Sequence, residues 1–469
     1  MSYNFITKMS LHFNVHSLSI ETRELISSEL KVDVNADADK SKKYFKKSYK
    51  PKKWVFPYRV CNNIVYLPLA WALKNIPGSQ RKSRKTYCQS SYDYTANLRP
   101  HQKEIRREAL SCLNKRGTVV ISAYPGFGKT VTSIGLAHKI GMRTLVLVNK
   151  VILKNQWVES VVQFTNLKKG VGVVKAEPAT KSQRENESKL KKWEKKIKDA
   201  SIVVMNALTV KKMPCNFFSD VGCLIVDECH QIMSECLSEA LLYVHPRYVI
   251  ALSATPYRSD GLNNLLTFYF SEEHLVRELK RSHTVYEIRT GFKPIADITD
   301  NGRLDWNGLL NSQSENEERN KLILETVSSL SDSRTILILT KRVDHASYLE
   351  SELKNMGVSV SGLYGTKKSF DKSASVLIGT SSKIGVGFDH KRLDCLVLAS
   401  DVESYFIQFL GRVFRREDVE PIILDFVDTN PVLRKHFRTR KSVYVKHGGN
   451  VITVKNPKSV LSLINKHSM

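Results

Sequence analysis

The chain of 469 residues is short of acidic side chains and has no long apolar run. Lys and Arg together number 73 against 46 Asp and Glu, which leaves a net charge of +27. No stretch approaches the roughly 20 apolar residues that a membrane span needs, and the first residues lack the apolar core of a signal peptide. We therefore expect a soluble, intracellular protein with no membrane partner. Its basic surface favours nucleic acid as partner, and an anionic membrane surface is the weaker alternative.

Cysteine motifs are also missing. The eight cysteines form no CxxC pair and no Cys/His spacing typical of zinc, so we expect reduced thiols that pack as small apolar groups. Hydrophobic residues make up 42% of the chain, enough to fill several cores. The length suggests about three structural units.

Residues 1–95 differ from the rest of the chain. They carry 17 Lys and Arg against 7 Asp and Glu, and eight of the lysines lie within residues 40–53, among aromatic side chains. Two short strands around Asn62 and Asn63, then a helix, are predicted beyond this run, and residues 78–94 read as a linker. We predict a small basic α+β domain that contacts nucleic acid through Lys43, Lys46 and Lys47. A localisation signal or a solubilising arm explains the lysine run equally simply.

From residue 98 onward, short apolar runs rich in β-branched residues alternate with helical stretches, as in strands of a parallel sheet buried on both faces. The runs are 118–123, 143–148, 201–206, 223–228 and 248–254, then 334–340, 375–380, 393–400 and 421–427. The pattern predicts two tandem α/β lobes, each with a doubly wound parallel sheet. The expected boundaries are 96–290 for the first lobe, 291–320 for a linker, 321–445 for the second lobe and 446–469 for a tail. Residues 181–198 form a charged insertion, expected to be a helix that faces solvent or nucleic acid.

A glycine-rich turn follows the first of these strands directly and precedes a helical stretch. Its residues are Ala123, Tyr124, Pro125, Gly126, Phe127, Gly128, Lys129 and Thr130. Between a strand and a helix, such a turn wraps backbone N–H groups around phosphate oxygens. Lys129 would then reach the β- and γ-phosphates, and the Thr130 hydroxyl would bind Mg²⁺. The alternative is a plain connecting turn, which the GKT ending in this context makes a poor fit.

Two adjacent carboxylates, Asp227 and Glu228, close the strand of residues 223–228. Ligands bind at the carboxyl edge of such sheets, so Asp227 suits the Mg²⁺ shell and Glu228 suits deprotonation of an attacking water. Taken alone, the pair would serve equally well as a helix cap. A phosphate-binding turn about 100 residues upstream favours the catalytic interpretation.

Two further motifs complete the set. Ser253 and Thr255 close another buried strand, where their hydroxyls could bond to the carboxylates or to the other lobe. Arg412 and Arg415 are predicted on one helix of the second lobe, where residues three apart share a face. Guanidinium groups brought to a γ-phosphate from a second lobe would neutralise charge that develops during phosphoryl transfer.

These motifs, in this order, resemble superfamily 2 helicases of the DEAD/H class across roughly residues 98–445. The resemblance is to the subgroup that contains the transcription/repair helicase and phage recombination helicases, and most of all to helicases of large DNA viruses. It implies RecA-like lobes that use ATP and Mg²⁺. It further implies roles for single residues. Gln102 reads adenine, and Gly387 and Asp389 border the ATP. Lys150 and Thr380 contact the nucleic-acid backbone, while His230, Ser253, Thr255 and Gln408 couple the ATP site to the nucleic-acid site.

The function predicted from the sequence is an ATP-dependent helicase or translocase that moves along DNA and unwinds it, with RNA as the second possible substrate. The subgroup leans toward 3′→5′ movement. A duplex translocase or transcript-release factor that hydrolyses ATP without separating strands is the first alternative. A nucleic-acid-binding protein with an inactive ATPase is the second, and the intact motif residues count against it. A viral origin would put the protein in the cytoplasm or nucleus of an infected cell.

Overall fold

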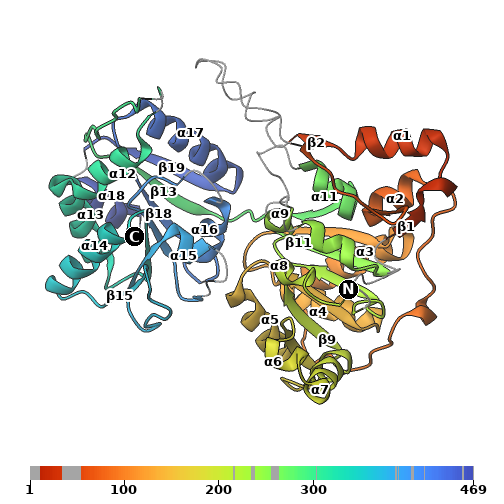
Figure 1. Cartoon of the computed structure of the whole chain (residues 1–469). Coiled ribbons are helices and arrows are strands. Elements are labelled where there is room, and N and C mark those ends of the chain that lie inside the picture. The colour runs from red at the N-terminus through yellow and green to blue at the C-terminus, as the bar shows by residue number, and fades with distance from the viewer. Residues whose placement is uncertain are drawn as a thin grey trace. The chain divides into compact units, whose positions relative to one another are not determined.

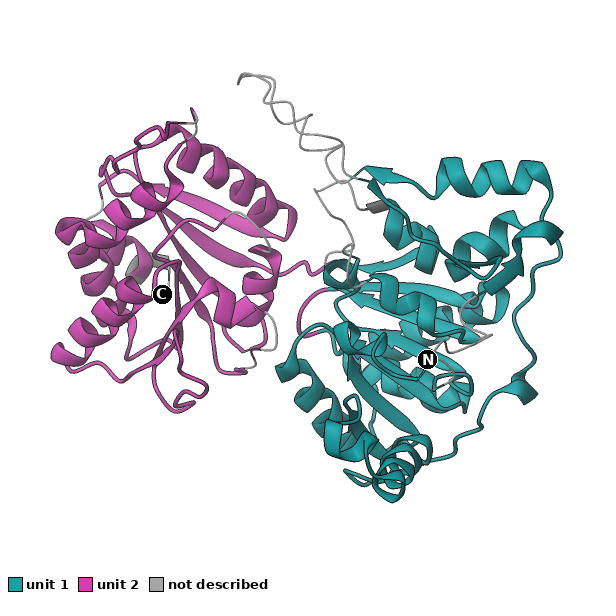
Figure 2. Cartoon of the chain, viewed as in Figure 1, with its two compact units in different colours: residues 1–123, 127–277 teal, residues 124–126, 278–469 magenta. Residues whose placement is uncertain are grey.

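The computed structural model describes residues 11–33, 54–214, 217–233, 238–254, 263–300, 302, 304–385, 388, 390–402, 406–416, 418–456 and 459–467. The chain forms two compact units, one of residues 1–123 and 127–277 and the other of residues 124–126 and 278–469 (Figure 2). In its described part, each unit is built on a seven-stranded parallel sheet with helices against its faces (Figure 1). The predicted pair of α/β lobes is confirmed. No helix within these ranges is both long and apolar enough to cross a membrane.

The sheet of the first unit has the strand order β12-β6-β11-β10-β7-β9-β8. Five of its strands coincide with the predicted apolar runs and are almost wholly buried: β6 (Thr118–Ala123), β7 (Thr144–Val148), β9 (Ile202–Asn206), β10 (Cys223–Val226) and β11 (Tyr248–Ser253). The sequence did not predict the two edge strands, β8 (Val173–Ala176) and β12 (His274–Arg277). Both are only four residues long, and β12 is only partly buried, so neither carries the apolar signal of a central strand.

Helices connect these strands and cover the sheet. They are α3 (Pro100–Arg116), α4 (Lys129–Ile140), α5 (Val151–Phe164), α6 (Lys181–Arg184), α7 (Glu187–Lys198), α8 (Ala207–Val210), α9 (Cys229–Ile232) and α11 (Asn263–Phe270). The charged insertion is helical as predicted, since it forms α6 and α7. Ile197 is the buried residue of α7, and the remainder of this basic helix is exposed or half-buried.

The basic N-terminal region is a small α+β structure that shares the core of the first unit. It contains β1 (Leu11–Asn14), α1 (Ile20–Glu29), β2 (Val32–Asp33), β3 (Trp54–Val55), β4 (Arg59–Cys61), β5 (Ile64–Leu67) and α2 (Leu69–Asn75). Strands β4 and β5 form the predicted hairpin: Asn62 and Asn63 have φ of 50° and 59°, which suits a tight two-residue turn. Trp71 of α2 and Phe270 of α11 belong to the same apolar cluster, so this region packs directly on the lobe.

The sheet of the second unit has the order β15-β16-β14-β17-β18-β13-β19. Four strands match the predicted runs: β14 (Ile336–Thr340), β16 (Val376–Thr380), β17 (Cys395–Leu398) and β18 (Ile422–Val427). The others are β13 (His283–Arg289), β15 (Val360–Leu363) and β19 (Gly449–Val454). The helices are α12 (Trp306–Glu315), α13 (Glu317–Leu330), α14 (Val343–Asn355), α15 (Ser381–Gly385), α16 (Phe406–Val413), α17 (Pro431–Lys446) and α18 (Val460–His467).

The boundary between the two units lies earlier in the sequence than we expected, after residue 277. We expected residues up to 290 in the first lobe and residues 446–469 in a tail. Instead, β13 pairs in parallel with β18 on one side and with β19 on the other, so both segments belong to the second sheet. Helix α12 likewise forms within the stretch expected to be a linker. The choice of partner strand is a tertiary property that the apolar pattern of β13 does not encode.

A buried ion network holds α17 to the second sheet. Arg440 donates through Nη2 to Asp425 of β18 at 2.8 Å and through Nη1 to Asp401 at 2.7 Å. Tyr444 Oη donates to Asp425 Oδ2 at 2.8 Å. Arg440 is only 4% exposed, so water cannot replace it as a partner for the two carboxylates.

Arg440→Leu is therefore expected to destabilise the second unit by about 3–5 kcal/mol, because it leaves the buried Asp425 carboxylate without its cation and Asp401 with His436 alone. Urea unfolding followed by circular dichroism would measure the loss. The exposed Arg438 on the same helix supplies the control, since Arg438→Leu breaks no buried pair. Equal stability of the two variants would contradict the role given to the network.

Candidate nucleotide site

The glycine-rich turn has the backbone geometry that phosphate binding requires. Strand β6 ends at Ala123 and α4 begins at Lys129. Between them, Gly126 and Gly128 each have φ of 90°, in the left-handed region that side chains disfavour. A side chain at Gly128 would also collide with the amide of Gln102. The turn therefore needs glycine at these positions, as expected for a loop whose N–H groups surround an anion.

Gln102 supports this turn from α3. Its Oε1 accepts from the backbone N–H of Arg99 at 2.9 Å, and its Nε2 donates to the carbonyl oxygen of Phe127 at 2.7 Å. The side chain is 5% exposed. This contact could not be predicted from the sequence, although the resemblance implies that Gln102 reads adenine. Gln102, near the start of α3, thus helps to hold the conformation of the glycine-rich turn.

Lys129 begins α4, and its ammonium lies beside the turn. Its Nζ donates to the carbonyl oxygen of Ala123 at 2.8 Å. A carbonyl is a weaker partner for an ammonium than a phosphate oxygen, because the phosphate carries a full charge. Lys129 Nζ is thus close enough to exchange this hydrogen bond for one to an anion bound at the turn. Thr130 follows it and is half-buried.

The carboxylate pair lies at the carboxyl end of β10, between β7 and β11. Asp227 is 8% exposed; burial and the neighbouring Glu228 raise its pKa to about 6. Trp157 of α5 lowers the pKa of Asp227, because its Nε1 donates a hydrogen bond to Asp227 Oδ2 at 2.8 Å. Glu228 adopts a left-handed backbone, with φ of 47°, which is costly for a residue with a Cβ.

These residues fit a divalent cation. A buried carboxylate with a raised pKa gains its charged form when a cation binds beside it. The Asp227 carboxylate and the Thr130 hydroxyl are oxygen ligands of the kind that Mg²⁺ prefers. No cluster of three or more metal-binding side chains occurs among the described residues. An ion here would therefore take most of its ligands from water and phosphate, which is how Mg²⁺ is usually held.

His230 joins the carboxylates to the end of β11. Its Nδ1 lies 2.8 Å from Ser253 Oγ and 3.5 Å from Glu228 Oε2. His230 is 1% exposed and Ser253 is fully buried. His230 thus lies between the Ser253 hydroxyl and the Glu228 carboxylate.

The second unit holds the predicted arginines, with one correction. Helix α16 ends at Val413, so Arg415 lies beyond it, and the prediction that Arg412 and Arg415 share a helix face is wrong. Arg412 donates through Nη2 to the carbonyl oxygen of Gly385 at 2.8 Å and through Nη1 to that of Phe388. Arg412 therefore ties α16 to the segment after β16. Burial lowers the pKa of Arg415 from its ordinary value.

The remaining predicted residues are placed as follows. Gln408 of α16 is buried, at 3% exposure, and Thr380 Oγ1 lies 3.2 Å from Ser382 Oγ at the end of β16. Lys150 precedes α5 and is half-buried, and the next two residues, Val151 and Ile152, are 64% and 49% exposed. Six predicted site residues lie outside the described residues: Lys43, Lys46, Lys47, Thr255, Gly387 and Asp389.

The contact of Trp157 with Asp227 has a measurable consequence. Trp157→Phe keeps an aromatic ring in the core but removes the only donor of the indole, so we expect about a tenfold rise in the Mg²⁺ concentration that half-saturates nucleotide binding. Titrating Mg²⁺ against a fluorescent ADP analogue measures this. Trp193→Phe is the control, because Trp193 lies in the insertion and donates to the backbone carbonyl of Glu177. An unchanged Mg²⁺ requirement would leave Trp157 with a packing role only.

Comparison with known proteins gives three kinds of similarity. The model of the family "Type III restriction enzyme, res subunit" matches residues 95–258. "Putative helicase 161L" of Invertebrate iridescent virus 6 is 38% identical over 466 residues, which cover 94% of this chain and 99% of the relative. The yeast structure "S. cerevisiae Dbp5 L327V bound to RNA and ADP BeF3" has the same fold at 14% identity, with a TM-score of 0.53 and coverage of 77% of this chain and 93% of that one.

A second solved structure shares the fold. It is "ATP-dependent Type ISP restriction-modification enzyme LlaBIII bound to DNA", at 13% identity and a TM-score of 0.53; the match covers 80% of this chain and 32% of that one. The viral relative, in contrast, matches nearly the full length of both chains, so its similarity extends over both described units and the N-terminal region.

Proposed function

This chain belongs to the superfamily 2 DExH-box helicases, with relatives among large DNA viruses, and we propose that it couples ATP hydrolysis to movement along DNA and to strand separation. The family makes it a nucleic-acid-dependent ATPase, a hydrolase that acts on a nucleotide. The observation that carries the proposal is the glycine turn, with Lys129 beside it, on the same sheet edge as Asp227 and Glu228. An inactive ATPase is disfavoured, because each of these groups is intact.

The chemistry we propose divides the work among these side chains. The turn and Lys129 hold the phosphates of ATP, and Thr130 with Asp227 would hold Mg²⁺, which supplies neutralising charge to the phosphate oxygens. Glu228 orients the attacking water and takes its proton. His230 and Ser253 carry the resulting change at Glu228 to β11.

Movement requires the second unit to sense the nucleotide. We propose that Arg415 approaches the γ-phosphate when the two lobes close, and that Arg412 and Gln408 hold α16 in position for this. The lobes would then differ in affinity for the strand between the ATP and ADP states, which converts hydrolysis into steps. The proposed strand contacts are Lys150 and Thr380, at the carboxyl edges of their sheets.

DNA is the proposed substrate because the most similar relatives compared are helicases of DNA viruses, such as that of Invertebrate iridescent virus 6; a more distant relative, from Acanthamoeba polyphaga mimivirus, is named a putative ATP-dependent RNA helicase. Of the proteins with this fold, one is described as bound to RNA and another as bound to DNA, so the substrate needs a direct test. We would measure ATP turnover with single-stranded DNA, duplex DNA and RNA, then unwinding of duplexes with 3′ or 5′ tails. Stimulation by DNA with unwinding from a 3′ tail supports the proposal. Triplex displacement without strand separation would support the duplex-translocase alternative.

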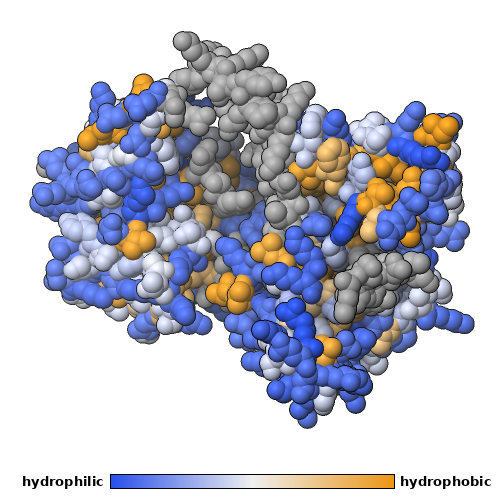
Figure 3. Space-filling view, viewed as in Figure 1, coloured by the Kyte–Doolittle hydropathy of each residue, from blue (hydrophilic) through white to orange (hydrophobic). Residues whose placement is uncertain are grey.

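The lysine run gives a separate prediction. The surface of the molecule is mostly hydrophilic on the face drawn in Figure 3. If Lys43, Lys46 and Lys47 bind backbone phosphates, replacing all three by Gln should lower the slope of log affinity against log salt by about 2–3. Substitution is the cleaner test, since deleting residues 1–60 would also remove β1, the partner of β5. An unchanged slope would leave the run as a localisation signal or a solubilising arm.

A further inference from the structure

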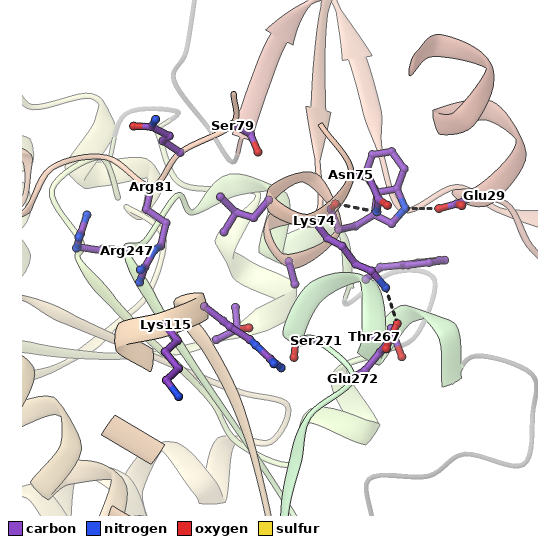
Figure 4. A pocket seen from close by; sticks show the side chains of 17 residues that line it. Glu29, Lys74, Asn75, Ser79, Arg81, Lys115, Arg247, Thr267, Ser271 and Glu272 are labelled. Atoms are coloured by element: carbon purple, nitrogen blue, oxygen red, sulfur yellow. Dashed lines mark hydrogen bonds and ion pairs between the residues drawn. The ribbon is translucent and has the colours of Figure 1, made fainter. Parts of the chain in front are cut away.

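A cavity of about 900 Å³ lies in the first unit, away from the glycine turn. It is bordered by Thr118, where β6 begins, and by Arg247, just before β11, so it lies at the amino edge of the sheet. The nucleotide residues lie at the carboxyl edge. Helices α2 and α11 and the end of α3 form its other walls (Figure 4). Its volume is in the range of sites that hold small organic ligands.

One wall of this cavity is positively charged. Arg81 and Arg247 lie side by side in Figure 4, with Lys115 below them. Both guanidinium groups lie against the ring of Tyr248, at 5.6 Å and 5.7 Å from its centroid. Among the described residues, none of these three cations has a carboxylate within ion-pair distance. Burial lowers the pKa of Arg81, and the like charge of Arg247 lowers it further.

The guanidinium groups are held in place by backbone carbonyls. Arg81 donates through Nη1 to the carbonyl oxygen of Leu113 and through Nη2 to that of Asn114, each at 2.8 Å. Arg247 donates through Nη1 to the carbonyl of Lys82, and its buried Nε has no hydrogen-bond partner within the described part of the chain. Carbonyls orient these cations but do not cancel their charge. The wall is thus a preorganised positive surface with donor capacity left over.

The opposite side of the cavity differs in charge. Lys74 pairs with Glu272 at 2.9 Å, and Glu29 accepts from Trp71 Nε1 at 2.7 Å (Figure 4). Arg116, which follows Lys115 at the end of α3, forms an ion pair with Glu273 and so is also balanced. Here each cation has its own acid, and the apolar side chains of Leu73 and Phe268 lie among the lining residues. The cavity therefore has one positive wall and one wall that is neutral and partly apolar.

We propose that this cavity binds a phosphate monoester whose phosphate lies against Arg81, Arg247 and Lys115 and whose organic part lies toward Trp71, Leu73 and Phe268. A dianionic phosphate matches the excess positive charge, and Arg binds phosphate with paired N–H donors. A free nucleotide and the 5′-phosphorylated end of a strand present the same group. The site is independent of the proposed ATP chemistry, because the two sets of residues do not overlap.

Equilibrium dialysis of the full chain carrying Lys129→Ala would test the proposal, since this substitution weakens phosphate binding at the glycine turn. The probes are AMP, a 5′-phosphorylated dinucleotide and the same dinucleotide without its phosphate. We expect the phosphorylated probes to bind at least tenfold more tightly than the unphosphorylated one. Binding of AMP assigns a free nucleotide, whereas binding of the dinucleotide alone assigns a strand end.

Two variants in the same background locate the binding. Lys115 is exposed, so Lys115→Glu should fold normally and reduce the affinity for the phosphorylated probe at least tenfold; Arg247→Gln should do the same. Lys74→Ala is the control, because Lys74 is already paired, and its affinity should change less than twofold. Equal binding with and without the phosphate, or full affinity in Lys115→Glu, would overturn the proposal. ATP turnover of Lys115→Glu with Lys129 intact separates this outcome from failure of the proposed function.

Discussion

Glu228→Gln is expected to stop ATP turnover while ATP still binds. The amide has the shape of the carboxylate but cannot accept the proton of the attacking water, and loss of a general base costs about 10²–10⁴ in rate. Binding should persist, because the groups proposed to hold the phosphates are the turn and Lys129. The constrained backbone at residue 228, with φ of 47°, is retained by a residue of equal size.

Single-turnover hydrolysis and binding of a fluorescent ATP analogue would be measured on the same preparation. Glu159→Gln serves as the matched control, because Glu159 is an exposed acid on α5 of the same unit. Turnover within a few fold of the unsubstituted chain would show that another group takes the proton. Asp227 would then be the first candidate, since its raised pKa suits a base.

The central strands could be predicted from the sequence because burial on both faces leaves an unmistakable composition. Strand β14, for example, is five apolar or β-branched residues, all buried. Strands β13 and β19 were assigned outside the second lobe for a physical reason. Strand β19 is half-exposed, and β13 is separated from its partner β18 by more than a hundred residues, so their place depends on tertiary pairing.

The site divides in the same way. Lys129, Asp227 and Glu228 could be predicted from the sequence. They lie in the glycine-rich turn or at a strand end, where local spacing determines their position. The contacts of Gln102 and Trp157 could not be predicted, since they join α3 and α5 to residues 25 and 70 positions away. The end of α16 was also missed. The helical spacing of Arg412 and Arg415 continues past Val413, but the helix does not.

Arg415→Ala is expected to slow hydrolysis by about 10³ with little change in ATP binding, the effect typical of an arginine that neutralises charge in the transition state. Burial lowers its pKa, yet a guanidinium remains protonated at neutral pH, so the side chain keeps its charge. Arg412→Ala should behave differently, because it removes the bonds to the carbonyls of Gly385 and Phe388 and should lower the stability of the second unit. Rapid-quench kinetics and thermal unfolding of both variants, with the exposed Arg438→Ala as control, separate the two roles. If Arg415→Ala hydrolysed ATP at the unsubstituted rate while Arg412→Ala stayed folded and lost turnover, Arg412 would be the arginine that acts on the nucleotide.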